Sequence, residues 1–232
     1  MNQNTGLIKF LKTALLPAHS TMYIWGGGWS PDDSGAGEDG TRLGVNPNWR
    51  KFYEAQGSDY DFKQHKFEYG NGLDCSGYVG WAVYNYFGGS KTGYVTHAKN
   101  QGRMFAEMGF GEYHPKMIEL VPGDIVSSID HVYITVARCA DGSIILLHSS
   151  PPGVQLCGTV TPRGGRVGIA DSLVKEYTKR FYPDWYRKFS YCSRGAAYFR
   201  DCGVFRWHDA VMPDPCGLKN MPPERILKIL FT

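Results

Sequence analysis

Cys75 lies in the stretch NGLDCSGYV, where its type and position suit nucleophilic chemistry. The apolar spacing that follows predicts a helix over residues 75–87, ended by a Gly-Gly pair. Cys75 then occupies the first turn, where unpaired N–H groups and the helix dipole favour a thiolate. Asp74 is a typical N-cap. Gly77 and Gly80 indicate close packing of this helix against a sheet. We therefore expect Cys75 to be an activated nucleophile.

A thiol nucleophile needs a base, and two of the seven histidines fall in strand-like segments. His131 begins HVYITVAR, residues 131–138, whose alternation predicts a half-buried strand. His148 ends the next apolar run, residues 143–148. Asp130 precedes His131 directly, points to the opposite face, and is a poor group to orient it. His131 and His148 are therefore the candidates for a base and its partner.

The register of this predicted hairpin tests whether the two histidines meet. If residues 139–142 form a four-residue loop, Arg138 pairs with Ser143. His131 and His148 then become diagonal neighbours on one face, roughly 7–8 Å apart at Cα. A two-residue turn would keep the face but separate them further.

The rest of the chain predicts a mixed α+β protein without internal repeats. We treat 1–232 as a single catalytic domain with a long polar insertion at about 29–72 and an extended part at about 159–232. The insertion is expected to be mainly a solvated loop, with one short helix near 48–56. Further helices are expected at 6–15, 96–108, 171–181 and 222–230, and strands at 125–126 and 196–207.

Composition excludes several classes of function. The net charge of +3, without a Lys/Arg run, gives no reason to expect nucleic acid as a partner. No run of about 18 apolar residues is present, so we expect no membrane span. We see no signal peptide, expect reduced thiols, and predict neither a metal nor a cofactor. A zinc site from Cys192, Cys202, Cys216 and His208 is disfavoured because no C-x-x-C pair exists.

Four sequence blocks resemble the NlpC/P60 family of cysteine peptidases. In order, they are Y-x-W-G-G at 23–27, D-C-S-G-Y-V at 74–79, P-G-D at 122–124 and D-H-V-x-I at 130–134. The block around Cys75 is the most specific. The blocks and His148 span a little over half of the chain, and the predicted helix at 6–15 fits the first helix of the family.

The resemblance implies a papain-like α+β fold, with the nucleophile helix packed on a central antiparallel sheet. Cys75 would be the nucleophile, His131 the base and His148 the third polar group. Tyr23 would bind the oxyanion together with the Cys75 N–H, and Trp25 belongs to the same block. Asp74 and Ser76 match positions that in some members meet the free amine of the substrate.

The family implies hydrolysis of peptide stems of bacterial peptidoglycan, often at γ-D-glutamyl bonds to a diamino acid. A peptidoglycan or muropeptide substrate and an extracellular or wall-associated location follow as expectations. The insertion 29–72 and the tail after 158 depart from the family pattern, and no wall-binding repeat is evident. Two alternatives therefore remain: a thiol-dependent acyltransferase or amidase acting on another substrate, and a non-catalytic binding domain.

Overall fold

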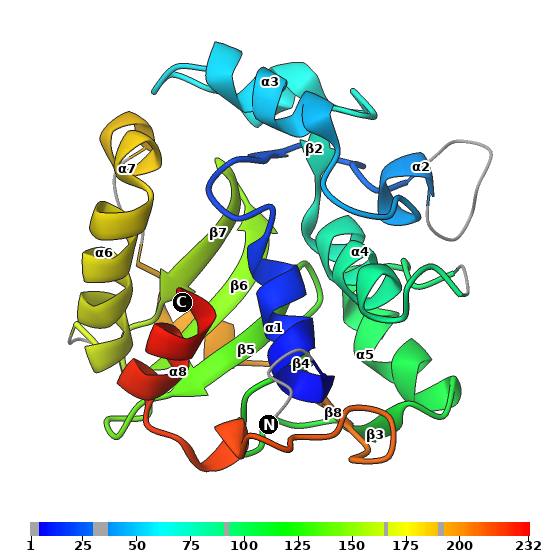
Figure 1. Cartoon of the computed structure of the whole chain (residues 1–232), viewed down its shortest axis with the longest axis vertical. Coiled ribbons are helices and arrows are strands. Elements are labelled where there is room, and N and C mark those ends of the chain that lie inside the picture. Colours follow the sequence, from blue (N-terminus) through cyan, green and yellow to red (C-terminus); the bar gives the residue numbers. More distant parts are fainter. Residues whose placement is uncertain (1–4, 30–36, 91–92, 165–166, 190–192) are drawn as a thin grey trace.

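The fold is α+β and is built around one curled, mostly antiparallel sheet (Figure 1). The computed structural model describes residues 5–29, 37–90, 93–164, 167–189 and 193–232. Within these residues, eight strands are ordered β2-β1-β7-β6-β5-β4-β8-β3, and only β1 and β2 pair in parallel. The predicted α+β class is confirmed, and the finer family assignment stays a prediction.

The strands are short at the edges of the sheet and longest in its middle. Their bounds are β1 Met22–Tyr23, β2 Gly72–Leu73, β3 Gly111–His114, β4 Ile125–Ser127, β5 Val132–Arg138, β6 Ile144–Ser150, β7 Gly153–Gly158 and β8 Gly203–Trp207. The prediction missed β1, β2, β3 and β7. It also started β8 too early, because 196–199 form a 3-10 helix instead.

The helices begin and end close to the predicted positions. The described α-helices are α1 Gly6–Leu15, α2 Gly37–Gly40, α3 Pro47–Ala55, α4 Cys75–Tyr86, α5 Ala98–Glu107, α6 Ile169–Phe181, α7 Pro183–Phe189 and α8 Pro223–Leu230. Helix α7 was not predicted, and α5 is capped at His97 rather than at Thr96. No helix in the described part of the chain is long and apolar enough to cross a membrane.

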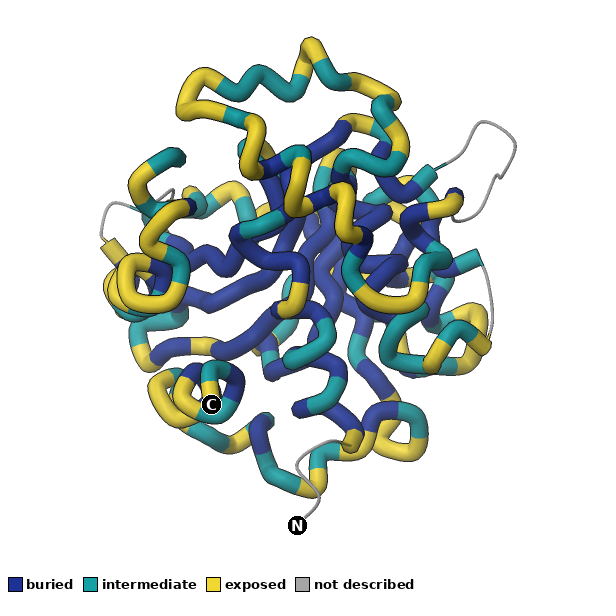
Figure 2. The backbone as a smooth tube through the Cα atoms, turned by 45° about the horizontal axis from the view of Figure 1, so that its top comes forward, coloured by how far each residue is buried: buried dark blue, intermediate teal, exposed yellow. Residues whose placement is uncertain are grey.

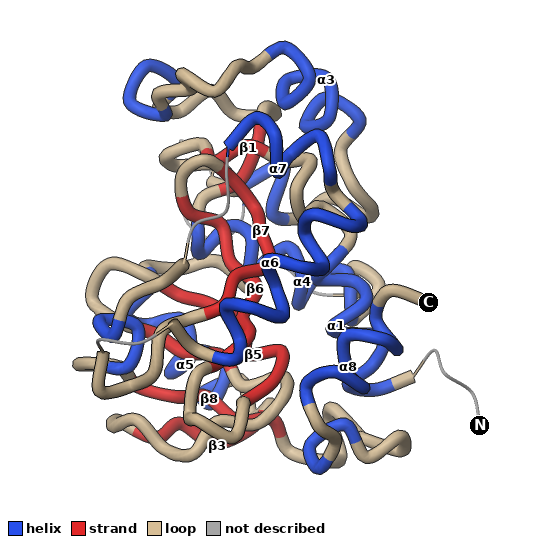
Figure 3. The backbone as a smooth tube through the Cα atoms, turned by 90° about the vertical axis from the view of Figure 1, so that its left-hand side faces the viewer, coloured by secondary structure: helices blue, strands red, loops and turns tan. Residues whose placement is uncertain are grey.

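The main core lies between the sheet and the helices on one of its faces (Figure 3). Alternate residues of β6 divide between two clusters. Ile145 and Leu147 join the core shared with α1, α4 and α8, whereas Ile144 and Leu146 pack on the opposite face, near the 3-10 helix η2 (Ala196–Phe199). Figure 2 shows the buried backbone concentrated in the middle of the molecule. His148 has the parity of Ile144 and Leu146, and so belongs to the second face.

Helix α4 begins at Cys75 because Asp74 caps it. The Asp74 carboxylate accepts a hydrogen bond of 2.7 Å from the Gly77 backbone N–H. Gly77 is required by close packing, since a Cβ there would lie 2.1 Å from the Gly27 carbonyl oxygen. A Cβ at Gly80 would lie 2.4 Å from Val95. The predicted close contacts exist, but the partners are a turn and a loop rather than the sheet.

The insertion is more ordered than predicted. It contains α2, α3 and a 3-10 helix, η1 (Phe62–His65), and Trp49 is fully buried. Asp39, expected to be solvated, is buried and accepts hydrogen bonds from the Asn46 side chain and the Gly70 backbone. Glu38 is exposed, as expected. Asp32 and Asp33 lie outside the described residues.

The insertion and the tail pack against each other, with α3 and α7 at the same end of the molecule (Figure 1). Lys188 of α7 donates hydrogen bonds to the carbonyls of Tyr53, Glu54 and Gln56, which end α3. The Trp185 and Tyr53 rings stack with centroids 5.6 Å apart. A lysine on the last carbonyls of a helix also complements the negative end of its dipole. The insertion and the tail therefore form one joint structure.

The β5–β6 hairpin reaches the predicted register at its functional end by a different route. Arg138 pairs with Ile144 rather than Ser143, so residues 139–143 separate the paired ends of the strands, one residue more than predicted. A bulge between Thr135 and Ala137 then adds one residue to β5 and restores the predicted pairing of Ile134 with Leu147. His131 and His148 become diagonal neighbours because these two one-residue differences cancel.

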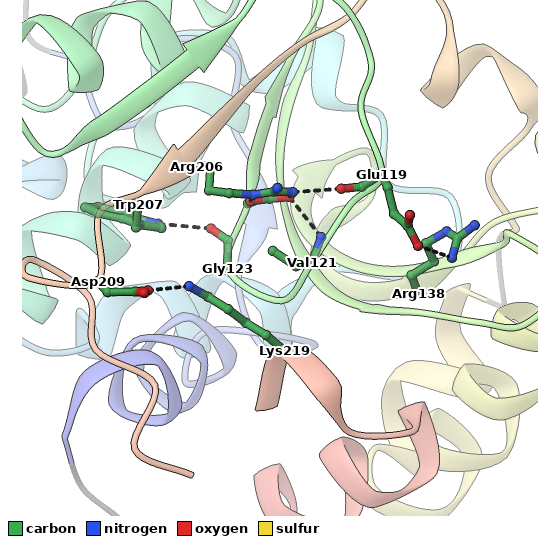
Figure 4. Close-up of polar contacts among 9 residues, drawn as sticks. Glu119, Val121, Gly123, Arg138, Arg206, Trp207, Asp209 and Lys219 are labelled. Carbon is green, nitrogen blue, oxygen red and sulfur yellow. Dashed lines mark hydrogen bonds and ion pairs between the residues drawn. The ribbon is translucent and has the colours of Figure 1, made fainter. Parts of the chain in front are cut away.

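The P-G-D turn is fixed by a buried carboxylate (Figure 4). Asp124 is 1% exposed and pairs with the Arg206 guanidinium at 2.7 and 2.9 Å. Its carboxylate also accepts from the Val121 N–H, and the Trp207 indole donates to the Gly123 carbonyl. This turn leads into β4, and so holds the strand beside β5. Asp124 therefore has a structural role.

Candidate active site

A pocket of about 510 Å³ lies at the start of α4. The predicted residues that line it are Tyr23, Trp25, Asp74, Cys75 and Ser76. Trp29, Phe67, Tyr69, His97, Ala98, Ile129 and Asp130 complete its described wall, together with Gly26. The pocket thus joins the Y-x-W-G-G turn, the nucleophile helix, the insertion and the loop before β5.

The two predicted histidines lie next to each other, but neither is among the residues that line the pocket. His131 Nε2 lies 2.7 Å from His148 Nδ1, and the two rings are nearly perpendicular. Cys75 lies at the start of α4, where the Val132 backbone N–H faces its thiol. The thiol thus lies beside the residue that follows His131. His131 keeps Nδ1 available for the thiol proton when its Nε2–H donates to His148.

Burial, rather than the helix dipole, dominates the charge state of the resting site. It raises the pKa of the Cys75 thiol to about 12, and the nearby Asp74 carboxylate adds to this rise. The Val132, Ser76 and Cys75 N–H groups act in the opposite direction, as expected at a helix start. Burial also lowers the pKa of His131 to about 3, with the Arg194 guanidinium contributing. Burial therefore acts against the thiolate that the helix start was expected to favour.

This electrostatic setting favours a neutral Cys75 thiol and a neutral His131 imidazole. A single charge created in either place would be poorly solvated. Transfer of the proton from Cys75 to His131 creates both charges together, and each then stabilises the other. The site therefore suits proton transfer coupled to attack on a substrate.

Tyr23 lines the pocket together with Cys75 and keeps its hydroxyl proton. Its pKa is raised by burial and by the nearby Cys75 and Asp74 groups, so its hydroxyl stays protonated. The insertion fixes its backbone, since the Tyr60 hydroxyl donates to the Tyr23 carbonyl at 2.6 Å. The Phe62 ring packs edge-on against the Tyr23 ring. The insertion therefore supports a residue of the site.

Asp74 is held almost entirely by the protein itself. Its carboxylate accepts from the Gly77, Gly26 and Ser76 backbone N–H groups and from the Ser76 hydroxyl. The Trp29 indole N–H in turn donates to the Ser76 hydroxyl at 3.2 Å. Burial is the largest influence on this carboxyl and raises its pKa to about 6. Asp74 is thus a structural cap and also a desolvated charge beside the thiol.

The Asp74→Asn variant is expected to be more stable than the wild type at pH 7 but not at pH 4. Because the pKa of Asp74 rises from 3.8 to about 6 on folding, the folded protein loses stability as the pH increases from 3.8 to about 6. Asparagine keeps the cap without the charge, so the gain at pH 7 should be about 1–2 kcal/mol. Urea unfolding of both proteins at the two pH values measures it.

The Asp74→Ala variant is the matched control for the cap. The difference between the Asn and Ala variants should be about 1 kcal/mol and independent of pH, because neither side chain titrates. An Asn variant with the same advantage over the wild type at pH 4 and pH 7 would contradict the raised pKa.

Several residues of the site were not predicted from the sequence. The Tyr198 hydroxyl lies 3.3 Å from His148 Nδ1, and the Tyr198 ring packs against those of Tyr133 and His131. Arg194 lies just beyond the end of β7, where its backbone forms an isolated bridge with that of Thr159. The sequence did not predict this contact. Both come from the tail, and no spacing or motif there indicates the histidine pair.

The other thiols lie outside this constellation. Cys139, Cys202 and Cys216 are free thiols in the structure, as is Cys75. Cys192 lies outside the described residues, so the disfavoured zinc set cannot be placed. Among the described residues, no three His, Cys, Asp or Glu side chains gather in a way that could hold a metal ion.

Comparisons with protein-family models, curated proteins and solved structures find no match for this chain. Its function must therefore be argued from the residues and their geometry.

Proposed function

We propose that the chain is a papain-like cysteine peptidase of the NlpC/P60 type that hydrolyses peptide stems of peptidoglycan. The bond proposed is the γ-D-glutamyl amide to the diamino acid. The main support is that Cys75, at the start of α4, lies beside Val132, the residue that follows His131, and that His131 lies 2.7 Å from His148. The four sequence blocks supply the substrate class.

The chemistry of these groups follows the ordinary course of thiol acyl transfer. Cys75 Sγ attacks the amide carbonyl carbon while His131 Nδ1 takes its proton. The His148 ring stabilises the imidazolium by accepting from His131 Nε2–H. Collapse of the tetrahedral intermediate breaks the C–N bond, and His131 returns the proton to the leaving amine. Water activated by His131 then hydrolyses the thioester.

The Tyr23→Phe variant is expected to lower kcat by about 10²–10³, as loss of one oxyanion donor does in other hydrolases. The phenyl ring keeps the packing against Phe62 and removes only the hydroxyl. Steady-state kinetics on a stem peptide measures the change. The Tyr84→Phe variant, on the far part of α4, should keep the wild-type rate. Equal rates for the Tyr23→Phe variant and the wild type would remove Tyr23 from the oxyanion site.

A digest of purified sacculi tests the proposal as a whole. Mass spectrometry of the soluble products should show new amino termini on the diamino acid and matching C-terminal D-glutamate. Products cut elsewhere in the stem would keep the enzyme class but change the bond. Sacculi and isolated stems that both stay intact would contradict the proposed substrate.

A second candidate is a thiol acyltransferase or amidase acting on an apolar acyl substrate. It is favoured by the apolar wall that Trp25, Phe67 and Ile129 present to the pocket. Intact-mass analysis after incubation with acyl donors separates the two. A lipid-sized thioester on Cys75 would support the transferase.

A further inference from the structure

Three aromatic side chains at the pocket mouth remain exposed although each is large and apolar. Trp25 is 50% exposed, Phe67 57% and Tyr69 39%. All three line the pocket that contains Cys75, and the Phe67 and Tyr69 rings have centroids 6.3 Å apart. We name these three residues the aromatic platform. Large exposed apolar groups gathered at one place commonly mark a binding surface.

Phe67 holds its ring there at a cost in backbone strain. Its φ is +61°, in the left-handed region that bulky residues rarely adopt. The conformation is tied by the Phe67 N–H, which donates to the Trp25 carbonyl at 2.8 Å. The ring lies over Gly26, where a Cβ would come within 2.6 Å of it. Strain of this kind that the surrounding structure maintains is characteristic of functional sites.

Protein groups already engage the polar side of the pocket. One oxygen of the Asp74 carboxylate accepts hydrogen bonds from the Gly77 N–H and from the Ser76 hydroxyl. The Ser76 hydroxyl in turn accepts from the Trp29 indole N–H. The aromatic platform is therefore the part of the described pocket wall with the most exposed apolar surface left for a ligand.

We propose that the aromatic platform binds a pyranose ring of the glycan strand, so that the enzyme prefers stems still linked to glycan. This inference rests on the proposed peptidase function and specifies its substrate. The residues of the stem itself are small or charged and offer no large apolar face. The glycan has such a face, because the axial C–H groups of a pyranose form a flat apolar surface. An open aromatic surface matches a flat ring better than an acyl chain, which needs enclosure.

Matched substrates test the preference directly. One is a stem peptide with a free amino terminus, and the other is the same stem linked to the N-acetylglucosamine–N-acetylmuramic acid disaccharide. The wild type should show a kcat/KM about tenfold higher on the linked stem, as one or two aromatic contacts would give. In the Phe67→Gly variant this ratio should fall close to one. Glycine adopts the left-handed conformation freely, so the melting temperature should not drop.

The Phe181→Ala variant is the control for loss of an exposed aromatic ring. Phe181 is 39% exposed on α6 and does not line the pocket, so the ratio should stay at its wild-type value. A wild-type ratio of one or less, or a Phe67→Gly ratio equal to that of the wild type, would overturn the proposal. Such results leave the peptidase function intact, because both stems are still cut.

A binding experiment separates failure of the platform from failure of the peptidase function. The catalytically inactive Cys75→Ala protein is titrated with a peptide-free tetrasaccharide of the glycan and followed by tryptophan fluorescence. Saturable binding that the Phe67→Gly substitution weakens about tenfold supports the platform even if no stem is hydrolysed. Dodecanoate serves as the probe for an apolar acyl chain. The platform proposal is overturned if the protein does not bind the tetrasaccharide, or if it binds dodecanoate alone.

Discussion

The Cys75→Ala variant is expected to lose stem hydrolysis by about 10⁴–10⁶ in kcat, because no other group can form the covalent intermediate. Among the described cysteines, Cys75 is the one that lines the pocket. Its thiol faces the backbone N–H of Val132, the residue that follows His131. Rates should be measured by chromatography of cleaved stem peptide over hours, so that a residual rate is detected.

Two other cysteines provide matched controls for this variant. Cys139 is also buried and directly follows β5, at the end of the strand opposite to His131. Cys202 lies nearer to the two histidines, and its thiol contacts the Arg200 carbonyl. The Cys139→Ala and Cys202→Ala variants should keep rates within about threefold of the wild type if they stay folded, because neither thiol lines the pocket. Full activity of the Cys75→Ala variant would refute the nucleophile assignment.

The His131→Ala variant is expected to lose about 10²–10⁴ in kcat, the usual contribution of a positioned base. The His131→Ala substitution should also lower the reactivity of the Cys75 thiol. Because burial keeps Cys75 protonated, a thiol without its base should also react more slowly with iodoacetamide near neutral pH. Peptide mapping of the alkylated protein measures this without any substrate.

The His208→Ala variant is the control for loss of an imidazole, since His208 is exposed in the turn after β8. Its hydrolysis and its alkylation of Cys75 should match the wild type. Hydrolysis by the His131→Ala variant at the wild-type rate would contradict the role of His131 as base.

Local signals explain which parts of the fold and site could be predicted. Helix α4 begins at the predicted Cys75 because capping by Asp74 is a short-range effect. The shared face of His131 and His148 follows from strand alternation. The predicted β5–β6 register is correct near the histidines only because the β-bulge offsets an error in the predicted loop length. Nothing in the sequence indicates that bulge.

Long-range packing explains what could not be predicted. The insertion was expected to be solvated, yet Lys188 and Trp185 of the tail fix it through the end of α3. Tyr198 reaches His148 from a segment 50 residues away in the sequence. The charge state of Cys75 depends on burial, which a pattern around one residue does not reveal. The residues of the candidate site could therefore be predicted from the sequence. The groups that pack around them could not, because tertiary structure determines them.

Trapping of the acyl-enzyme tests the central claim most directly. The wild-type protein is mixed with excess stem peptide, quenched in acid within the first turnover, and weighed intact. We predict a mass gain equal to the acyl half of the stem minus water, mapped to Cys75 and released by hydroxylamine as expected for a thioester. Hydrolysis without any such adduct, or an adduct on a different residue, would contradict the account.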